Sequence, residues 1–407
     1  MSLAAWFRTT EAAARVRVGE VDRVLGAALV GLLGFGTVMV YSASTIEATV
    51  RYKDPEYYLK KQLAFAVLAM IVMWVVSHID YHRIRKLTYP ILIGVTLLMG
   101  ATVLGLGQRR GGAARWLHFG PVMIQPAEMV KLALVLWLAY SLAKKAERVK
   151  SFKIGMIPHL LMSGFLIFLC LKQPDLGSAL VLAFLTFTLL FVAGARISYL
   201  LGVGLLAGGV VVNLVMSKAY RMSRIMAFLD LAGHRQDIAY QPFQSVMSFG
   251  SGGLTGLGLG KGLQVLYLPE AHNDFIAAII GEELGFVGVI LLAGAFLLLV
   301  SRGVRIALRA QDDYGSYIAF GISALMGVQA LVNLSVAMAI MPTKGLTLPF
   351  ISYGGSSLLV NAAAAGILLN ISRERTQMAA PTEVVPLSVD SPEASVTVVT
   401  AAEEGTA

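Results

Sequence analysis

The chain has 407 residues, of which 57% are hydrophobic and only 14% are charged, and its mean hydropathy is +0.73. Soluble globular domains carry about 25% charged residues, so this composition excludes a soluble domain and indicates a protein that crosses a membrane several times. The net charge is +9 at pH 7. Because the basic residues are spread through the connections between apolar segments, they favour contact with anionic membrane lipids over binding of nucleic acid.

Ten apolar segments follow one another along the chain, and each approaches the roughly 20 residues that an α-helix needs to cross a bilayer. We therefore predict an all-α polytopic membrane protein with about ten transmembrane helices, since a β-barrel would show shorter, alternating segments. The predicted spans cover residues 24–41, 63–77, 90–106, 127–142, 154–171, 176–194, 197–216, 275–300, 317–340 and 353–370.

The two ends of the chain differ from this membrane domain, which we assign to residues 23–375. Residues 1–22 mix acidic and basic side chains without an apolar core, so we expect a cytoplasmic N-terminal segment and no cleaved signal peptide. Residues 376–407 contain no basic side chain and are predicted to form a disordered cytoplasmic tail. Basic residues are enriched in the connections that share a side with both termini, which the positive-inside rule assigns to the cytoplasm.

The longest connection, residues 217–273, is predicted to lie outside the cytoplasm between the seventh and eighth spans. Arg221 and Arg224 are spaced to share one face of an amphipathic helix. That face would suit a diphosphate at the membrane surface or, equally, solvent and lipid. A glycine-rich run from Gly250 to Gly260 lacks the framing strand and helix of a nucleotide site, so we expect a flexible loop there.

Four polar clusters interrupt the apolar pattern, each at the start of an even-numbered span and hence on the outer face. They cover residues 112–131, 173–178, 268–274 and 342–357. In the first cluster, Glu128 and Lys131 are three residues apart on one helix face, which fits either a structural ion pair or contact with an anionic or hydroxyl-rich substrate. In the second, Asp175 follows Gln and Pro and is more typical of a helix cap than of a catalyst.

Asp274 is the strongest candidate for a functional residue, because an ionisable side chain at a membrane edge is costly to place there. At the first turn of its helix it would feel the positive end of the helix dipole, so we expect it to be ionised near neutral pH. It could accept a proton from an attacking hydroxyl or hold a divalent ion, and the alternative is a helix N-cap. Glu282 and Glu283, two turns further, are expected to be hydrogen-bonded inside the bundle.

Several long motifs occur in a fixed order: GGAARWL with QPAEMVK, then QPDLGSA, YQPFQS, LPEAHNDFI with GEELGF, and PTKGLTLPFISYGGSS. Together they resemble the SEDS (shape, elongation, division and sporulation) family from about Asp22 to Arg375. The sequences of the PTKGLTLP and GEELG motifs are more similar to those of the division-type members than to those of the elongation-type members. The chain departs from the family at Asn273, where Thr is usual, and between Asp230 and Tyr240, where the expected prolines are absent.

This resemblance implies a peptidoglycan glycosyltransferase that polymerises lipid II at the outer face of the bacterial cytoplasmic membrane, at the division septum. Its partners would be a class B penicillin-binding protein, other division proteins and membrane lipids. Asp274 is then the implied catalytic residue, taking a proton from an acceptor sugar hydroxyl while undecaprenyl diphosphate leaves. The motifs identify no cofactor, and a Mg²⁺ ion at Asp274 stays open.

The remaining candidate residues belong to the same motifs or to the long connection. Candidate substrate contacts are Arg115, Glu128, Lys131, Arg221, Arg224, Gln244, His272, Lys344 and Ser356. Candidate supporting residues are Asp175, Glu270 and Glu283.

Three other functions compete with this one: a transporter that flips lipid II, an elongation-type polymerase, and a scaffold that recruits division proteins. A transporter should carry coupling charges near the membrane midplane and open to both faces. Here the deep charges are few and the polar motifs gather on one side, which favours the enzyme.

Overall fold

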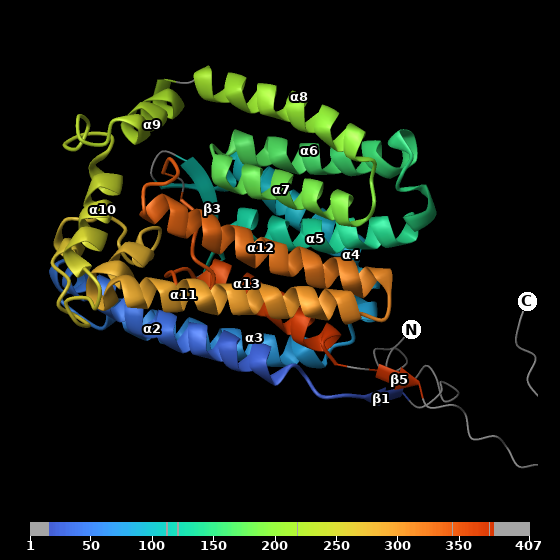
Figure 1. Cartoon of the computed structure of the whole chain (residues 1–407), viewed down its shortest axis with the longest axis horizontal. Helices are drawn as coiled ribbons and strands as arrows, with labels where there is room; N and C mark the ends of the chain where they lie inside the picture. The colour runs from blue at the N-terminus through green and yellow to red at the C-terminus, as the bar shows by residue number, and fades with distance from the viewer. Residues whose placement is uncertain are drawn as a thin grey trace, which may run out of the picture. The chain divides into compact units, whose positions relative to one another are not determined.

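The computed structural model describes residues 16–110, 113–119, 122–217, 219–343, 345–373 and 375–377, and these fall into two units (Figure 1). The smaller unit contains the strands β1 (Val16–Val18) and β5 (Arg375–Gln377), which pair antiparallel with Val16 opposite Gln377. The larger unit, Glu20–Glu374, contains the apolar helices. Most of the predicted N-terminal segment and residues 378–407 of the predicted tail lie outside the described residues.

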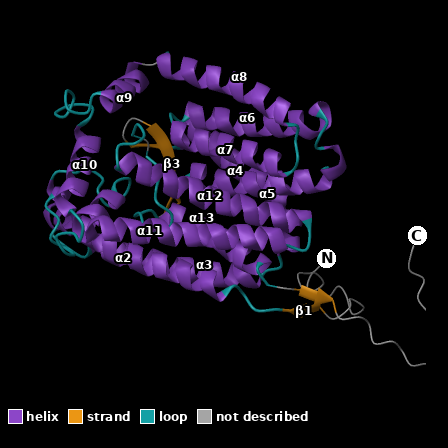
Figure 2. Cartoon of the chain, in the orientation of Figure 1, coloured by secondary structure: helices purple, strands orange, loops and turns teal. Residues whose placement is uncertain are grey.

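Helices account for most of the larger unit (Figure 2). Its first half contains α2 (Arg23–Tyr52), α3 (Tyr57–His78), α4 (Tyr81–Ala101), α5 (Pro126–Lys144), α6 (Ile157–Lys172) and α7 (Leu176–Val192). Its second half contains α8 (Ile197–Met216), α9 (Ala219–Leu229), α10 (Tyr240–Gly252), α11 (Ile276–Arg309), α12 (Asp313–Ala337) and α13 (Gly355–Ile371). A π-helical turn, Thr102–Leu106, extends α4, and another, Phe152–Met156, precedes α6.

All ten predicted spans are helical. In the described part of the chain, eight helices are long and apolar enough to cross a membrane, while α7 and α13, with 17 residues each, are shorter apolar helices. The chain is therefore a multi-pass membrane protein, and the predicted all-α class is confirmed. The small antiparallel sheet of β2 (Gln108–Arg110), β3 (Ala113–Phe119) and β4 (Val122–Ile124) was not predicted, because such short strands carry little periodic signal.

Two helices extend well beyond the predicted spans. α2 continues to Tyr52, and the hydroxyls of Ser44 and Thr45 donate to carbonyl oxygens four residues earlier, which satisfies these polar side chains within the helix. α11 runs for 34 residues to Arg309 and is interrupted at Gly285, where φ is 66°.

The centre of the larger unit is formed by α12 and α5, which are buried along most of their length. α12 packs against α11, α5 and α7, and α13 packs against α3 (Figure 1). By contrast α8, which is described throughout, has no buried residue. The chain order brings the starts of α5, α7, α11 and α13 to one end of the bundle, which we call the Asp274 end. The opposite end, between α11 and α12, is called the Asp312 end.

The predicted outer connection is more structured than the sequence suggested, since it contains α9, α10 and a 3₁₀ turn at Gln264–Leu266. The glycine-rich run is held against the interruption of α11: the amides of Leu257 and Gly258 donate to the carbonyls of Glu282 (3.0 Å) and Glu283 (2.9 Å). Gly256 has a φ of +80°, and a β-carbon there would overlap the Glu283 carbonyl. The prediction of a flexible loop is therefore wrong, because these glycines permit a close backbone approach.

The two acids at this interruption are hydrogen-bonded inside the bundle, as predicted. The Glu282 carboxylate accepts from the amides of Leu263 (2.8 Å) and Gln264 (3.1 Å). The Glu283 carboxylate accepts from the Ser42 hydroxyl (2.6 Å). Glu283 thus ties α11 to α2, and Glu282 ties α11 to the outer connection.

Candidate active site

Asp274 lies in the turn that precedes α11, which begins at Ile276. Its side chain caps no helix, because the N-cap position is Phe275, and it keeps partial access to solvent. The pKa of Asp274 is raised to about 7: burial is the largest cause, the nearby carboxylates of Glu270 and Asp175 act in the same direction, and the guanidinium groups of Arg115 and Arg224 oppose them. The expectation that this carboxyl is ionised near neutral pH is therefore not met, because desolvation leaves the group close to half-protonated at pH 7.

Arg115 ties β3 to the turn before α7. Its Nε donates to the carbonyl of Gln173 (3.1 Å) and its Nη2 to the carbonyl of Pro174 (2.5 Å). Asp175, the next residue, caps α7 by accepting from the Ser178 amide (3.0 Å), which confirms its predicted capping role. These contacts bring a cation from one motif and an acid from another into the electrostatic environment of Asp274.

Arg224 reaches the same region from the long connection. Its Nη1 donates to the carbonyl of Thr343 (3.0 Å), which joins α9 to the segment before α13. Two residues later, Gly345 packs against the catalytic candidate: a β-carbon there would lie 2.8 Å from Asp274 Oδ2. Arg221 also lies in α9, as its predicted helix requires, but its side chain and the whole of Lys344 fall outside what the structure describes.

Glu128 and Lys131 form the predicted ion pair, with Lys131 Nζ 2.7 Å from Glu128 Oε1. Both side chains are buried, and the Lys131 side chain is only 1% exposed. Together with Arg115 and Asp175 they surround Cys170 within electrostatic range. In this structure the pair is a buried ion pair within α5, and its contact with a substrate stays a prediction.

The other predicted residues are distributed around this region. His272 is buried against the rings of Tyr58 and Tyr353, with ring centroids 4.6 and 5.6 Å away, and its Nδ1 lies 3.5 Å from the Glu47 carboxylate. Burial keeps the pKa of His272 below its usual range, although the Glu47 carboxylate opposes this, so a neutral ring is favoured.

Ser356 and Glu270 also make local contacts, and Gln244 lies apart. Ser356 Oγ donates to the Met123 carbonyl (2.7 Å), which links α13 to β4. The Glu270 carboxylate accepts a hydrogen bond from the Asn273 side chain. Gln244 lies on α10, and among the described residues nothing ties its side chain to this region.

Four of the predicted residues therefore interact electrostatically with the Asp274 carboxyl. We call the five residues the polar cluster: Arg115, Asp175, Arg224, Glu270 and Asp274. Within the described ranges, no three His, Cys, Asp or Glu side chains gather in a metal-binding arrangement. The protein side chains around Asp274 thus do not form a complete metal site. Mg²⁺ is usually held by one or two carboxylates and substrate phosphates, so the proposed ion at Asp274 stays a prediction.

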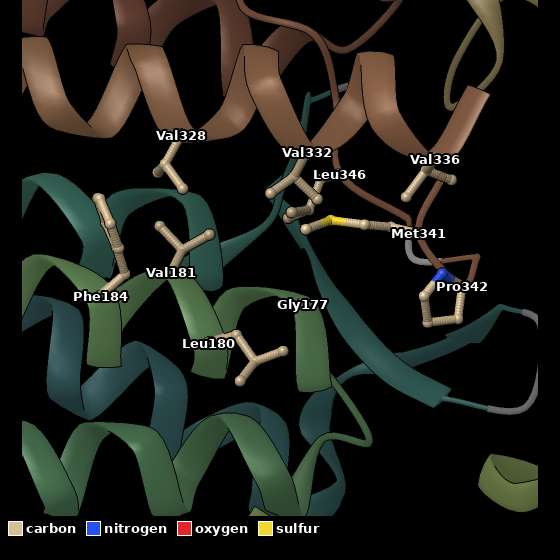
Figure 3. A pocket seen from close by; sticks show the side chains of 10 residues that line it. All are labelled: Gly177, Leu180, Val181, Phe184, Val328, Val332, Val336, Met341, Pro342 and Leu346. Carbon is tan, nitrogen blue, oxygen red and sulfur yellow. The ribbon is translucent and has the colours of Figure 1, made fainter. Parts of the chain in front are cut away.

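An apolar pocket of 270 Å³ adjoins the polar cluster (Figure 3). It lies between α7 and α12, where Val181 and Phe184 face Val328 and Val332. Gly177 and Leu346, which also line it, are close in sequence to Asp175 and to Gly345. The pocket offers hydrocarbon contacts within a short distance of charged groups, an arrangement that suits an amphiphilic ligand.

The family model FtsW/RodA/SpoVE, described as "cell cycle protein", matches residues 23–377. The chain belongs to this family. It is 46% identical over 358 residues to "Probable peptidoglycan glycosyltransferase FtsW" of Trichlorobacter lovleyi, covering 88% of this chain and 94% of that protein.

Two solved structures also resemble this FtsW/RodA/SpoVE member. One is titled "Structural coordination of polymerization and crosslinking by a peptidoglycan synthase complex", with a TM-score of 0.72 and 30% identity over 86% of this chain and 97% of that chain. The other is RodA of Thermus thermophilus, with a TM-score of 0.63 and 29% identity over 86% of this chain and 96% of that chain.

Sequence reasoning missed two polar residues of this family member, a buried asparagine and a half-exposed glutamate. Asn333, in α12, donates to the carbonyl of Asp274 (3.0 Å), and Glu47, in α2, faces His272. A polar residue inside a predicted apolar span was the available signal for Asn333. Glu47 lies beyond the predicted end of the first span, so it was assigned to a connection.

Proposed function

We propose that this chain polymerises lipid II into glycan strands at the outer face of the cytoplasmic membrane, with Asp274 as the catalytic base. Membership of the FtsW/RodA/SpoVE family and high identity to proteins named as peptidoglycan glycosyltransferases support the reaction class. The observation that carries the site assignment is the position of Asp274 in a cluster with Arg115 and Arg224, with a pKa raised by burial to about 7.

A base works best when its pKa lies near the operating pH, because a useful fraction is then deprotonated and still basic. The Asp274 carboxylate takes the proton of the acceptor sugar 4-hydroxyl as that oxygen bonds to the anomeric carbon of the donor. The bond from this carbon to the diphosphate oxygen breaks, and the electron pair leaves with undecaprenyl diphosphate. In-line displacement converts the α-linkage of the donor to a β-linkage in the glycan.

The departing diphosphate requires cations more than it requires an acid. Arg115 and Arg224 both interact electrostatically with Asp274, and guanidinium groups bind phosphate oxygens in bidentate fashion. The pocket between α7 and α12 would take the first isoprene units of the lipid, since its lining is apolar and it adjoins the cluster. A polar headgroup and a hydrocarbon chain can thereby be held at once.

The division-type role is supported by the higher identity to the protein named FtsW (46%) than to the solved RodA (29%). On this proposal the enzyme acts at the septum, with both termini in the cytoplasm, beside other division proteins. The resemblance to a synthase complex that couples polymerisation to crosslinking supports a class B penicillin-binding protein as the partner.

The test is polymerisation of lipid II by the purified protein in proteoliposomes that contain the partner transpeptidase. Asp274→Asn removes the base with little change in shape and should lower the rate at least about 1,000-fold, at the upper end of general-base effects. Asp237→Asn, which neutralises an exposed carboxylate of the long connection, is the matched control and should polymerise like the wild type. Wild-type polymerisation by Asp274→Asn would refute the proposal, and loss of lipid II flipping in that variant without loss of polymerisation would favour the transporter.

A further inference from the structure

Three consecutive backbone carbonyls around Asp274 each accept a hydrogen bond from a distant segment. The carbonyl of His272 accepts from the Tyr353 amide (2.9 Å), and that of Asn273 accepts from the Ser352 hydroxyl (2.7 Å). The carbonyl of Asp274 accepts from the Asn333 side-chain amide (3.0 Å). The short turn that carries the catalytic carboxylate is therefore fixed residue by residue.

Asn333 joins this turn to a second segment. The same Nδ2 donates to the carbonyl of Leu346 (2.7 Å), so one amide group bridges two segments of irregular backbone. The residue is 2% exposed and lies near the end of α12, which is packed between α11, α5 and α7. A buried amide on one of the two most enclosed helices is a rigid reference point for both segments.

The bridge also determines what stands beside the carboxylate. Leu346 follows Gly345, whose missing side chain leaves room for Asp274 Oδ2. Ser352 extends the same connection, because its hydroxyl accepts from the Leu348 amide (2.9 Å) while it donates to Asn273. The position of the carboxylate is thus fixed relative to the segment before α13, which Arg224 contacts through the Thr343 carbonyl.

The backbone on both sides of these contacts is strained. Glu270 has a φ of 58° and Phe350 a φ of 64°, values that residues with side chains rarely adopt. Such conformations persist only where surrounding contacts enforce them, and they concentrate at functional sites. The hydrogen bonds from Asn333, Ser352 and Tyr353 lie within four residues of both positions.

We propose that Asn333 is a positioning residue: its side-chain amide fixes the Asp274 turn against the Leu346 segment and so places the carboxylate for proton transfer. This inference rests on the proposed role of Asp274 as the base. The amide need not touch the substrate, because a displacement of about 1 Å at the reacting group is enough to lower a rate about 100-fold.

The test compares Asn333→Ala with Asn370→Ala in the proteoliposome assay, with lipid II titrated at fixed partner concentration. Asn370 is a matched control, because it is 3% exposed and its side chain also bridges two backbone groups, the Ser77 carbonyl (2.8 Å) and the Tyr81 amide (3.0 Å), at the opposite end. We expect Asn333→Ala to lower kcat about 100-fold with KM within about twofold, and Asn370→Ala to leave kcat within about threefold. Equal effects of the two substitutions on kcat, or a rise in KM alone for Asn333→Ala, would overturn the positioning role.

A second pair of variants covers the case in which Asn333→Ala does not yield folded protein. Ser352→Ala removes the donor to Asn273, whereas Ser352→Thr retains a hydroxyl. We expect kcat to fall about tenfold in the alanine variant and to return to within about threefold of wild type in the threonine variant. Equal kcat values for the two would overturn the inference.

Asp274→Asn in the same assay separates the two proposals. If this variant polymerises at the wild-type rate, the base assignment fails, whatever Asn333 does. If it is inactive while Asn333→Ala behaves like Asn370→Ala, only the positioning role fails.

Discussion

Two aspartates stand just before long helices at opposite ends of this bundle, and their surroundings differ. Asp312 caps α12 at the Asp312 end, where it accepts from the Gly315 amide (2.9 Å) and the Tyr81 hydroxyl (2.8 Å) and lies 3.4 Å from His82. Asp274 precedes α11, and among the described residues its carboxylate accepts no hydrogen bond. One acid is fully used by the fold, and the other is left available.

The pKa values of the two groups express this difference. Burial opposes ionisation of Asp312, but hydrogen bonds from His82, the Gly315 amide and Tyr81 outweigh it and lower its pKa to about 2. For Asp274 burial prevails, and its pKa rises to about 7. A helix start alone does not decide the charge of an aspartate; the number of donors that face it does.

Backbone geometry separates the ends in the same way. All described non-glycine residues with positive φ lie at the Asp274 end: Lys53, Pro174, Glu270, Ala339 and Phe350. The Asp312 end instead contains a partly buried ion pair between Asp22 and Arg302 (2.8 Å), and the Asp22 amide also donates to Ser372. Strained backbone conformations occur at the end where the reaction is proposed, whereas the opposite end is joined by ion pairs and hydrogen bonds.

The largest contrast between the ends should come from their arginines. Arg224→Ala removes a cation beside Asp274 and should lower kcat about 100-fold, as expected for the loss of one group that stabilises developing charge. Arg305→Ala removes an exposed arginine from the other end of α11 and should leave kcat within about twofold. Lipid II polymerisation by both purified variants is the measurement, and similar rates for the two would contradict the assignment of Arg224.

The pH dependence of polymerisation should report the Asp274 end alone. Below a pKa of about 7 the carboxyl is protonated and cannot act as a base, so the rate should fall about tenfold per pH unit well below pH 7 and level off above it. Glu270→Gln removes a neighbouring negative charge, lowers the pKa of Asp274 and should move this limb to lower pH.

The control for this profile is Glu56→Gln, which neutralises an exposed acid at the start of α3. Initial rates between pH 5 and pH 9 give the comparison. An unchanged profile in Glu270→Gln would show that another group governs the limb.

The contribution of Asp312 to stability should be lost at low pH. Because the folded-state pKa of Asp312 lies below its unfolded value of 3.8, its stabilisation is present above about pH 4 and is lost as the pH falls toward 2. After allowance for partial exposure, Asp312→Asn should lower the free energy of unfolding at pH 7 by about 1 kcal/mol. Thermal unfolding in detergent would measure this, and an unchanged melting temperature would contradict it.

A change of similar size but opposite sign is expected for stability at the Asp274 end. The folded-state pKa of Asp274 lies above 3.8, so ionising it costs stability progressively between about pH 4 and pH 7. Asp274→Asn should therefore raise the melting temperature at pH 8, by an amount that corresponds to about 1 kcal/mol, and leave it nearly unchanged at pH 4. A lower melting temperature at pH 8 would indicate that the carboxylate is a structural partner.

Features that depend on local sequence were predictable. Apolar runs located the ten helices, the three-residue spacing located the Glu128–Lys131 pair, and the Gln-Pro-Asp pattern located the Asp175 cap. Each of these depends on neighbours within one or two helical turns.

Features that depend on tertiary contacts were not. The raised pKa of Asp274 follows from burial by segments far away in the chain, and the helix dipole alone suggested the opposite charge state. The contact of Arg115 with the Gln173 carbonyl joins residues 58 positions apart. Asn333 acts through backbone carbonyls, which no motif of side chains can reveal.

The close backbone contact between the outer connection and α11 limits which amino-acid substitutions this chain can accept. A β-carbon at Gly256 would overlap the Glu283 carbonyl, and one at Gly285 would overlap the Gly256 amide. Neither position can accept a larger amino acid without displacing the backbone of the facing segment, so a mutational library should leave both glycines untouched. A reporter would be better inserted at the exposed turn around Arg235, where the tight contact of the neighbouring Gly233 is with the side chain of Asp230 and not with the backbone of a distant segment.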